Sequence, residues 1–268
     1  MTVLDEILAT KLDEVTMLHR REVRDLLHAE ALTAPPPRKF APALGVANDA
    51  GFMGVIAEIK RRSPSKGDLA PDLDPVATAQ AYEAGGADCL SVLTDGPFFG
   101  GSVKDLQSAR DAVSLPVLRK DFVIDPIQVF EARAISADAV LLIAAALPDD
   151  ALFADLHALA VELGLAVLVE THNEPELERA LTIGARVVGV NARDLGTFDE
   201  DLGIGERLAS LIPGDVIAVA ESAIRSVEHA ARMAAGGFDA VLVGELLVKS
   251  DDPTAAVREL TGVTRTPR

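Results

Sequence analysis

Short apolar runs and Ala-rich amphipathic segments alternate along the chain from residue 54 onward, with polar turns between them. Successive apolar runs begin 21–34 residues apart, which suits one strand and one helix per repeat. We expect eight strands, at Val55–Ile59, Cys89–Leu93, Pro116–Leu118, Ala139–Ile143, Ala166–Val169, Val187–Val190, Val216–Ala220 and Ala240–Val243. Because strands that alternate with helices pair in parallel, the pattern predicts a parallel sheet with helices packed on it.

Eight strand–helix units in about 210 residues favour a closed (β/α)8 TIM barrel, which is an α/β fold. An open, doubly wound sheet is the alternative. It is disfavoured because no Gly-x-Gly-x-x-Gly follows a strand, and because unusual polar residues stand where many of the strands end. A barrel brings all those ends to one rim. Tight helix-to-strand turns are expected at Gly86–Asp88, Ser136–Asp138 and Gly237–Asp239.

The first fifty residues follow a different pattern. Apolar residues recur there at helical spacing: Leu4, Ile7, Leu8, Leu12, Val15, Leu18, Val23, Leu26 and Leu27. They predict one or two amphipathic helices, which Pro35–Pro37 ends in favour of an extended connector. We therefore expect residues 1–50 to form a helical extension with a Pro-rich connector, and residues 51–268 to form a single catalytic barrel.

Composition narrows the choice of partners and compartment. With 25 basic and 42 acidic side chains the net charge is −17, which disfavours nucleic acid and anionic membrane surfaces. The longest apolar run, Ala139–Leu147, is too short to span a bilayer, and the N-terminus lacks the basic start of a signal peptide. The single Cys89 cannot form an internal disulfide. These features predict a cytoplasmic protein, and no metal or organic cofactor is signalled.

Charged residues at three of the expected strand ends suggest chemistry. Glu58 and Lys60 point to the same side of the first strand, toward the barrel mouth, although a structural ion pair is the alternative. Lys120 follows the third strand and can act as a general acid if burial or neighbouring cations lower its pKa; otherwise it is an ordinary surface lysine. Glu170 follows three aliphatic residues, so we expect desolvation to raise its pKa. The loop Ser63–Gly67 could close over a ligand.

Later strand ends add groups that suit an anionic ligand. Asn191 can both donate and accept hydrogen bonds, and Arg193 can bind a carboxylate, unless it pairs with Asp194 within its loop. Ser222 and Gly244 lie after the seventh and eighth strands, where such barrels bind phosphate, although structural turns remain the alternative. The predicted ligand is a small phosphorylated molecule with a second anionic group, held by Lys60, Lys120 and Arg193.

Several of these segments together resemble the indole-3-glycerol-phosphate synthase family of tryptophan biosynthesis. The matching segments are Ala57–Ser65 (AEIKRRSPS), Leu118–Phe122 (LRKDF), Val169–Glu170, Gly189–Leu195 (GVNARDL) and Ala220–Ser222. The resemblance runs from about residue 35 to 260, and the N-terminal helical extension also resembles that of the family. It implies ring closure of 1-(2-carboxyphenylamino)-1-deoxyribulose 5-phosphate with loss of carbon dioxide and water, without a cofactor.

The resemblance also implies a role for each residue. Lys120 would protonate the ribulose carbonyl, Glu170 would handle the proton transfer that expels hydroxide as water, and Glu58 and Lys60 would assist. Either lysine could give the first proton, and the resemblance favours Lys120. The remaining roles are Asn191 on sugar hydroxyls; Arg193, Ser63, Phe99, Phe122, Glu221 and Leu242 around the rest of the substrate; and Ser222, Ala223, Gly244 and the amide of Glu245 on phosphate.

Two positions depart from the family pattern at the expected phosphate site. Ala223 stands where the family commonly has Gly, and it would be strained if that residue needs a positive φ. Glu245 follows Gly244 in place of a small residue. The alternatives to this family are another sugar-phosphate lyase or isomerase and a catalytically silent ligand-binding barrel. A monomer or weak homo-oligomer is expected, with other tryptophan-pathway enzymes as candidate partners.

Overall fold

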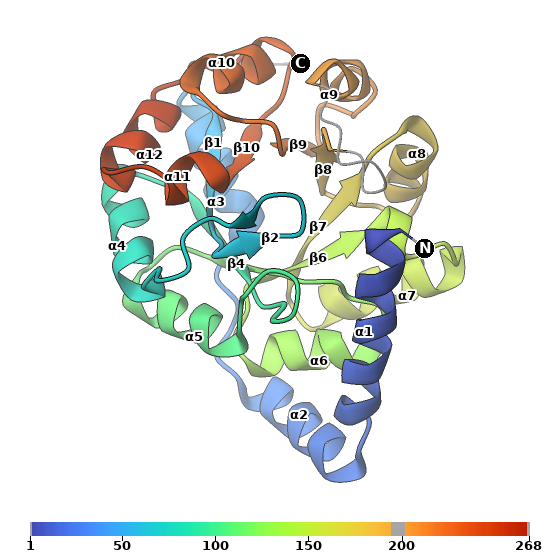
Figure 1. Cartoon of the computed structure of the whole chain (residues 1–268). Helices are drawn as coiled ribbons and strands as arrows, with labels where there is room; N and C mark the ends of the chain where they lie inside the picture. Colours follow the sequence, from blue (N-terminus) through green and yellow to red (C-terminus); the bar gives the residue numbers. More distant parts are fainter. Residues whose placement is uncertain (1, 194–201, 267–268) are drawn as a thin grey trace.

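The computed structural model describes residues 2–193 and 202–266, and the described strands close into a barrel (Figure 1). All neighbours in the barrel are parallel, and the first strand pairs with the last. In spatial order the strands are β1 (Gly54–Ile59), β10 (Ala240–Val243), β9 (Ile217–Glu221), β8 (Val187–Asn191), β7 (Ala166–Thr171), β6 (Ala139–Ile143), β5 (Val117–Lys120) and β4 (Cys89–Leu93). The closure confirms the predicted (β/α)8 barrel and excludes the open sheet.

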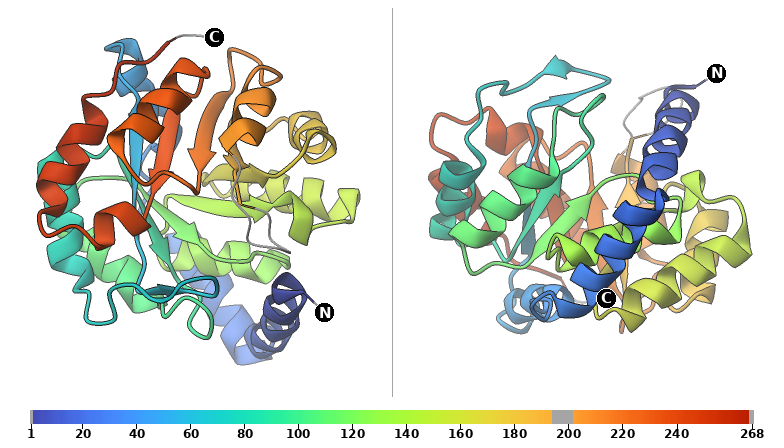
Figure 2. Two further views of the ribbon diagram at one scale, coloured as in Figure 1. Left: turned by 45° about the horizontal axis from the view of Figure 1, so that its top comes forward. Right: turned by 90° about the horizontal axis from the view of Figure 1, so that it is seen from below.

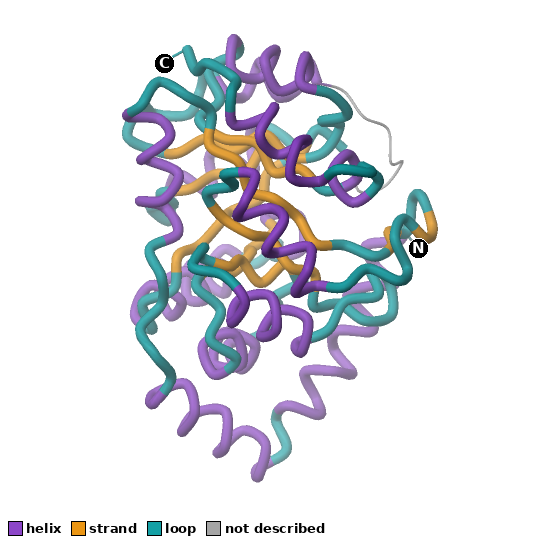
Figure 3. Tube along the Cα trace, turned by 90° about the vertical axis from the view of Figure 1, so that its left-hand side faces the viewer, coloured by secondary structure: helices purple, strands orange, loops and turns teal. Residues whose placement is uncertain are grey.

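Helices cover the outside of the barrel, as the alternating pattern predicts (Figure 3). They are α4 (Pro75–Gly85), α5 (Val103–Ala112), α6 (Pro126–Ala134), α7 (Asp150–Glu162), α8 (Glu174–Thr182), α9 (Leu202–Ala209), α10 (Val227–Ala235) and α12 (Pro253–Thr261). Most begin at a Ser, Asp or Asn whose side chain accepts a backbone N–H, as at Asp74, Ser102, Asp125, Asp149, Asn173, Ser226 and Asp252. Each such cap stabilises its helix by about 1 kcal/mol.

The expected helix-to-strand turns are present, and each also holds a neighbouring strand through a hydrogen bond. Their first residues are left-handed, with φ of 93° at Gly86, 65° at Ser136 and 92° at Gly237. Two residues later an Asp carboxylate accepts a 2.8 Å hydrogen bond from a backbone N–H of a neighbouring strand: Asp88 from Val55, Asp138 from Val117 and Asp239 from Ala218. The recurring Asp therefore ties adjacent strands together at the amino end of the barrel.

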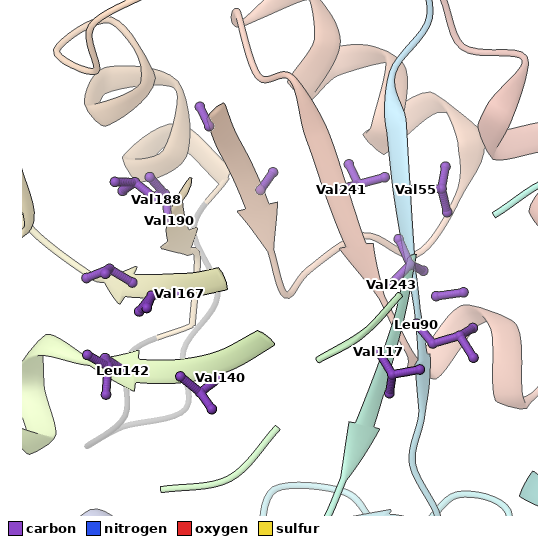
Figure 4. Close-up of a cluster of buried hydrophobic side chains, with 14 of the residues drawn as sticks. Val55, Leu90, Val117, Val140, Leu142, Val167, Val188, Val190, Val241 and Val243 are labelled. Carbon is purple, nitrogen blue, oxygen red and sulfur yellow. The ribbon is translucent and has the colours of Figure 1, made fainter. Parts of the chain in front are cut away.

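Alternate residues of each strand build two separate apolar layers. Outward side chains such as Val55, Val117 and Val241 pack under the helices (Figure 4). Inward ones such as Ile56 and Leu118 fill the barrel. Because the period of a strand is two, the same alternation turns Glu58 inward at the carboxyl end.

Residues before the barrel form α1 (Val3–Leu18), α2 (Arg21–Thr33) and α3 (Phe40–Asp49). The first two lie on the α6 side of the barrel (Figure 2). The sequence pattern does not predict α3, whose Phe40 and Leu44 are fully buried with the inward residues of the strands. No helix within the described residues is both long and apolar enough to cross a membrane.

One buried lysine attaches α1 to the barrel. Lys11 is only 1% exposed, and its ammonium lies 2.9 Å from Asp95, 2.8 Å from Asp121 and 2.8 Å from Glu14. Burial lowers the pKa of Lys11, but Asp121, Glu14 and Asp95 together raise it by more than burial lowers it. The net shift is upward, so the lysine stays charged. Asp121 directly follows Lys120, so this contact joins the extension to a predicted catalytic strand end.

Replacing Lys11 by Met should lower the free energy of unfolding by about 3–5 kcal/mol, because two buried carboxylates lose their shared cation. Urea unfolding followed by circular dichroism measures this. The exposed Lys104 provides the control, since Lys104→Met should change stability by about 0.5 kcal/mol or less. Equal stabilities for the two variants would contradict the anchoring role of Lys11.

Candidate active site

A pocket opens at the carboxyl ends of the barrel strands, and every residue that the sequence predicted for the site lines it. These residues are Glu58, Lys60, Ser63, Phe99, Lys120, Phe122, Glu170, Asn191, Arg193, Glu221, Ser222, Ala223, Leu242, Gly244 and Glu245. They come from strands far apart in the sequence and from the loops that follow them. The barrel therefore brings the predicted residues together, while their chemical roles stay predictions.

The centre of the pocket is an ammonium group facing two buried carboxyls. Lys120, at the end of β5, donates a 3.1 Å hydrogen bond to Oε2 of Glu170 on β7. Its Nζ also lies 3.7 Å from Oε2 of Glu221 on β9. Asn191, at the end of β8, donates a 2.9 Å hydrogen bond to the other oxygen of Glu170. Glu170 is thus held from both sides.

The pKa of Glu170 moves opposite to the sequence prediction. Burial does raise it, but the Lys120 ammonium, His172 and the Asn191 hydrogen bond lower it more, so the net pKa lies well below the usual range. The prediction of a raised value is wrong because the sequence shows the aliphatic strand but not the cation on the neighbouring strand. Glu170 is therefore ionised at neutral pH.

A lowered pKa was the condition under which the sequence predicted Lys120 to act as an acid, and the structure shows the opposite shift. Burial lowers it, but the charges of Glu170, Glu221 and Glu58 raise it well above its usual range. Lys120 consequently carries its proton throughout the neutral range, which is the form that a proton donor needs.

Glu221 is the carboxyl whose pKa is raised. Burial and the nearby charge of Glu170 bring it to about 8, although Lys120 opposes the shift. Its Oε1 makes no hydrogen bond within the described residues. A Cβ at Gly189 would lie 1.9 Å from this oxygen, so glycine on β8 makes room for Glu221. Two carboxyls with opposite pKa shifts thus face one ammonium, a pattern typical of acid–base sites.

Glu58 and Lys60 form an ion pair on the opposite side of the pocket, with 2.5 Å between Nζ and Oε1. Both side chains point inward from the end of β1, as the two-residue period predicts. A Cβ at Gly244 would lie 2.5 Å from Oε1 of Glu58, so only glycine lets the chain after β10 pass this close.

The loop after β1 and the loop after β4 bring further predicted residues to the pocket. Residues Arg62–Ser63 (β2) and Gly67–Asp68 (β3) form a short antiparallel hairpin. Ser65 between them accepts a 3.3 Å hydrogen bond from Arg193. Phe99 and Phe122 lie 6.1 Å apart between ring centroids, with an interplanar angle of 37°. Asp194 and Leu195, part of the motif that carries the resemblance, lie outside the described residues.

The candidate phosphate loop has a strained backbone. Ser222 and Ala223 both have positive φ, 64° and 57°. The sequence raised this possibility for Ala223, where the family commonly has Gly. After Gly244 the short helix α11 (Glu245–Val248) begins, and the Glu245 carboxylate pairs with Lys249 at 2.7 Å. This pairing partly neutralises the negative charge that Glu245 brings to the site.

The sequence from residue 4 to 260 matches the family model of indole-3-glycerol phosphate synthase. The chain belongs to this family. It is 54% identical to indole-3-glycerol phosphate synthase of Leifsonia xyli subsp. xyli, over 91% of this chain and 93% of that protein. It is 51% identical to indole-3-glycerol phosphate synthase of Nocardioides sp., over 98% of this chain and 99% of that protein. The solved structure of 3-hexulose-6-phosphate synthase from Salmonella typhimurium is similar with a TM-score of 0.63, covering 79% of this chain and 98% of that one; at 15% identity it shows the fold alone.

Sequence reasoning missed some of the pocket of this indole-3-glycerol phosphate synthase family member. Val3, Leu4 and Ile7 of α1 line it, although their pattern reveals only an amphipathic helix. His172 lies against Glu170, and only its place two residues after that carboxylate could have suggested this. Within residues 2–193 and 202–266 no cluster of His, Cys, Asp and Glu is arranged to hold a metal ion.

Replacing Ala223 by Gly should raise the free energy of unfolding by about 0.5–1 kcal/mol. An alanine in the left-handed conformation destabilises the folded state by about 1–2 kcal/mol. Glycine removes this strain, but its greater freedom in the unfolded chain offsets part of the gain. Ala231→Gly in the exposed face of α10 is the control and should lower stability by about 1 kcal/mol. Thermal unfolding measures both, and destabilisation by Ala223→Gly would contradict the strain.

Proposed function

We propose that this chain closes the ring of 1-(2-carboxyphenylamino)-1-deoxyribulose 5-phosphate to give indole-3-glycerol phosphate, carbon dioxide and water, in tryptophan biosynthesis. The observation that carries the proposal is the partly buried Lys120 ammonium between an ionised Glu170 and a Glu221 with a raised pKa. Membership of the indole-3-glycerol phosphate synthase family supports the same reaction.

Ring closure needs an acid at the substrate carbonyl. As the aromatic carbon attacks, negative charge develops on the carbonyl oxygen, and Lys120 gives that oxygen a proton. Lys60 forms an ion pair with Glu58 on the other side of the pocket from Glu170. It supplies a second positive charge near the same substrate oxygen. The ring carbon that carried the carboxylate then loses carbon dioxide, and the electrons of the broken bond restore the aromatic ring. Lys120 regains its proton from water, which supplies the one proton that the overall reaction consumes.

The last step removes water and needs a base together with an acid. The leaving hydroxide takes the proton of Glu221, and ionised Glu170 accepts the proton that the substrate loses, which restores one proton to the pair. This assignment differs from the sequence expectation that Glu170 itself protonates the hydroxide. The reason is that a carboxyl with a strongly lowered pKa holds no proton to give.

The other pocket residues would bind the two ends of the substrate. Asn191 would contact sugar hydroxyls, and Arg193 with Ser63 would hold the carboxylate of the anthranilate ring. Phe99, Phe122 and Leu242 would pack on the ring, and Ser222, Ala223, Gly244 and the amide of Glu245 would bind phosphate. All of them line the same pocket, which supports these roles.

The wider setting of the enzyme is part of the proposal. We infer a cytoplasmic enzyme in which residues 51–268 carry the catalytic barrel and residues 1–50 are an extension. We also infer a monomer or weak homo-oligomer with other tryptophan-pathway enzymes as partners. Light scattering on purified protein would test the oligomeric state.

Mixing purified protein with the anilino-deoxyribulose phosphate tests the function directly. Indole fluorescence should appear, and carbon dioxide should be released in equal amount. Absence of both with a folded protein would contradict the proposal.

Lys120→Met should lower turnover by roughly 10²–10⁴, because the variant cannot protonate the carbonyl as the ring closes. Steady-state indole fluorescence measures this, and circular dichroism checks folding. Lys104→Met, an exposed lysine outside the pocket, should turn over like the parent. Near-parental turnover in the Lys120 variant would rule out its role as the acid.

Glu170→Gln should block dehydration while leaving ring closure possible. Under single-turnover conditions, carbon dioxide should be released well before indole appears, with indole formation slowed by roughly 10²–10⁴. Rapid quench for carbon dioxide and stopped-flow fluorescence separate the two steps. Glu174→Gln, at the exposed start of α8, is the control. Accumulation of unreacted substrate alone would assign Glu170 to an earlier step.

A further inference from the structure

His172 lies outside the pocket lining but in contact with Glu170. It follows β7 directly, and its Nε2 is 3.3 Å from Oε1 of Glu170. Nε2 is buried and has no well-formed hydrogen bond among the described residues, so its contact with Glu170 is electrostatic. The other ring nitrogen, Nδ1, lies 3.0 Å from Oε2 of Glu176. The imidazole therefore stands between two carboxylates.

Glu176 is held in place by the start of α8. Asn173 caps this helix, accepting the backbone N–H of Glu176 and donating a 2.8 Å hydrogen bond to its Oε1. The backbone N–H of His172 donates to Oε2 at 2.9 Å. Helix capping explains these contacts, since a Glu at this position commonly reaches back to the chain before the helix. It does not explain why the imidazole ring spans from Glu176 to Glu170.

The surroundings of His172 favour its positive form. Burial lowers the pKa of His172, but the contacts and charges of Glu170 and Glu176 outweigh burial and raise it to about 10. Beyond these, the charged groups of this cluster are Lys120 on β5, Glu221 on β9 and Glu58 on β1. His172 is therefore an imidazolium at neutral pH, with Nδ1 hydrogen-bonded to Glu176 and Nε2 in electrostatic contact with Glu170.

Glu170 and Glu221 differ in the positive charge around them. Lys120 serves both, at 3.1 Å and 3.7 Å. Of these two carboxyls, His172 contacts Glu170 and not Glu221, and Asn191 donates a hydrogen bond to Glu170 as well. Two buried carboxyls facing one ammonium cannot both ionise freely, so one proton is shared between them.

We propose that His172 decides which of the two carboxyls, Glu170 or Glu221, carries their shared proton. It is a positioning residue, oriented by Glu176, that keeps the proton on Glu221 and leaves Glu170 ionised. The inference rests on the proposed function, because dehydration needs that division into base and acid.

His172→Gln tests the proposal through the pH profile of kcat. In the parent, activity should fall as the shared proton is lost, near pH 8. Removing the imidazolium makes the fully ionised pair less favourable, so this basic limb should move up by about one pH unit. The maximal kcat should fall about tenfold, because the proton then spends more time on Glu170, and KM should change little. Loss of kcat with an unmoved limb would reduce His172 to a structural role and overturn the proposal.

Two further variants act as a second test and a control. Glu176→Gln should move the limb in the same direction but less, since the imidazolium remains and is only held more weakly. It keeps the proposal testable if His172→Gln does not fold. His157→Gln removes a half-buried histidine on α7 that lies outside the pocket lining, and its pH profile should match that of the parent. An unmoved limb in Glu176→Gln, with His172 still charged as in the parent, would remove Glu176 from the proposal.

NMR titration of the histidine rings provides a readout that does not depend on activity. In the full chain without substrate, the His172 signal, assigned by its loss in His172→Gln, should keep its imidazolium shift up to about pH 9. In Glu176→Gln the midpoint should fall by about one pH unit or more. A midpoint near 6.5 in the parent would overturn the proposal. If the parent does not turn over the substrate, the proposed function fails instead, and this titration still measures the charge of His172.

Discussion

The charge balance around one partly buried ammonium group, that of Lys120, is the constraint on which the rest of the site depends. A charge that is partly removed from water needs opposite charges near it. Glu170 and Glu221 meet this need from strands that lie far from Lys120 in the sequence. The strand period turns these three side chains inward, and the missing side chain at Gly189 leaves room for Glu221.

The strand that carries Lys120 is fixed from its outer side by a second polar network. Arg119 points away from the barrel axis because it alternates with Lys120 along β5, and Asp121 follows directly after the strand. Asp121 accepts hydrogen bonds from Thr94 and Arg119, and pairs with Lys11 of α1. The same helix that lines the pocket with Val3, Leu4 and Ile7 thus also holds the end of the catalytic strand. The extension and the barrel are therefore joined at Asp121, the residue next to Lys120.

Much of this architecture could be predicted from sequence because it depends on local period and on strand ends. Runs such as Cys89–Leu93 and Ala139–Ile143 coincide with observed strands, and the polar residues after them reach the pocket. The pKa directions of Glu170 and Lys120 could not be predicted, since each depends on the other across fifty residues of chain. The helix α3 was missed for a similar reason: Phe40 and Leu44 pack against inward residues of the strands, which is a tertiary contact that follows a Pro-rich segment.

Acid and base roles in this pocket are properties of the surroundings rather than of the residue type. Glu170 and Glu221 are chemically identical and lie near the carboxyl ends of β7 and β9, where both face Lys120. Their pKa values nevertheless move in opposite directions. The difference follows from what stands behind each: a histidine and an asparagine beside Glu170, and a bare glycine backbone beside Glu221. The same reasoning explains how a chain of net charge −17 can bind an anionic substrate. Lys60, Lys120 and Arg193 converge on one pocket, and the electric field at each point there is set by the groups nearest to it rather than by the net charge of the chain.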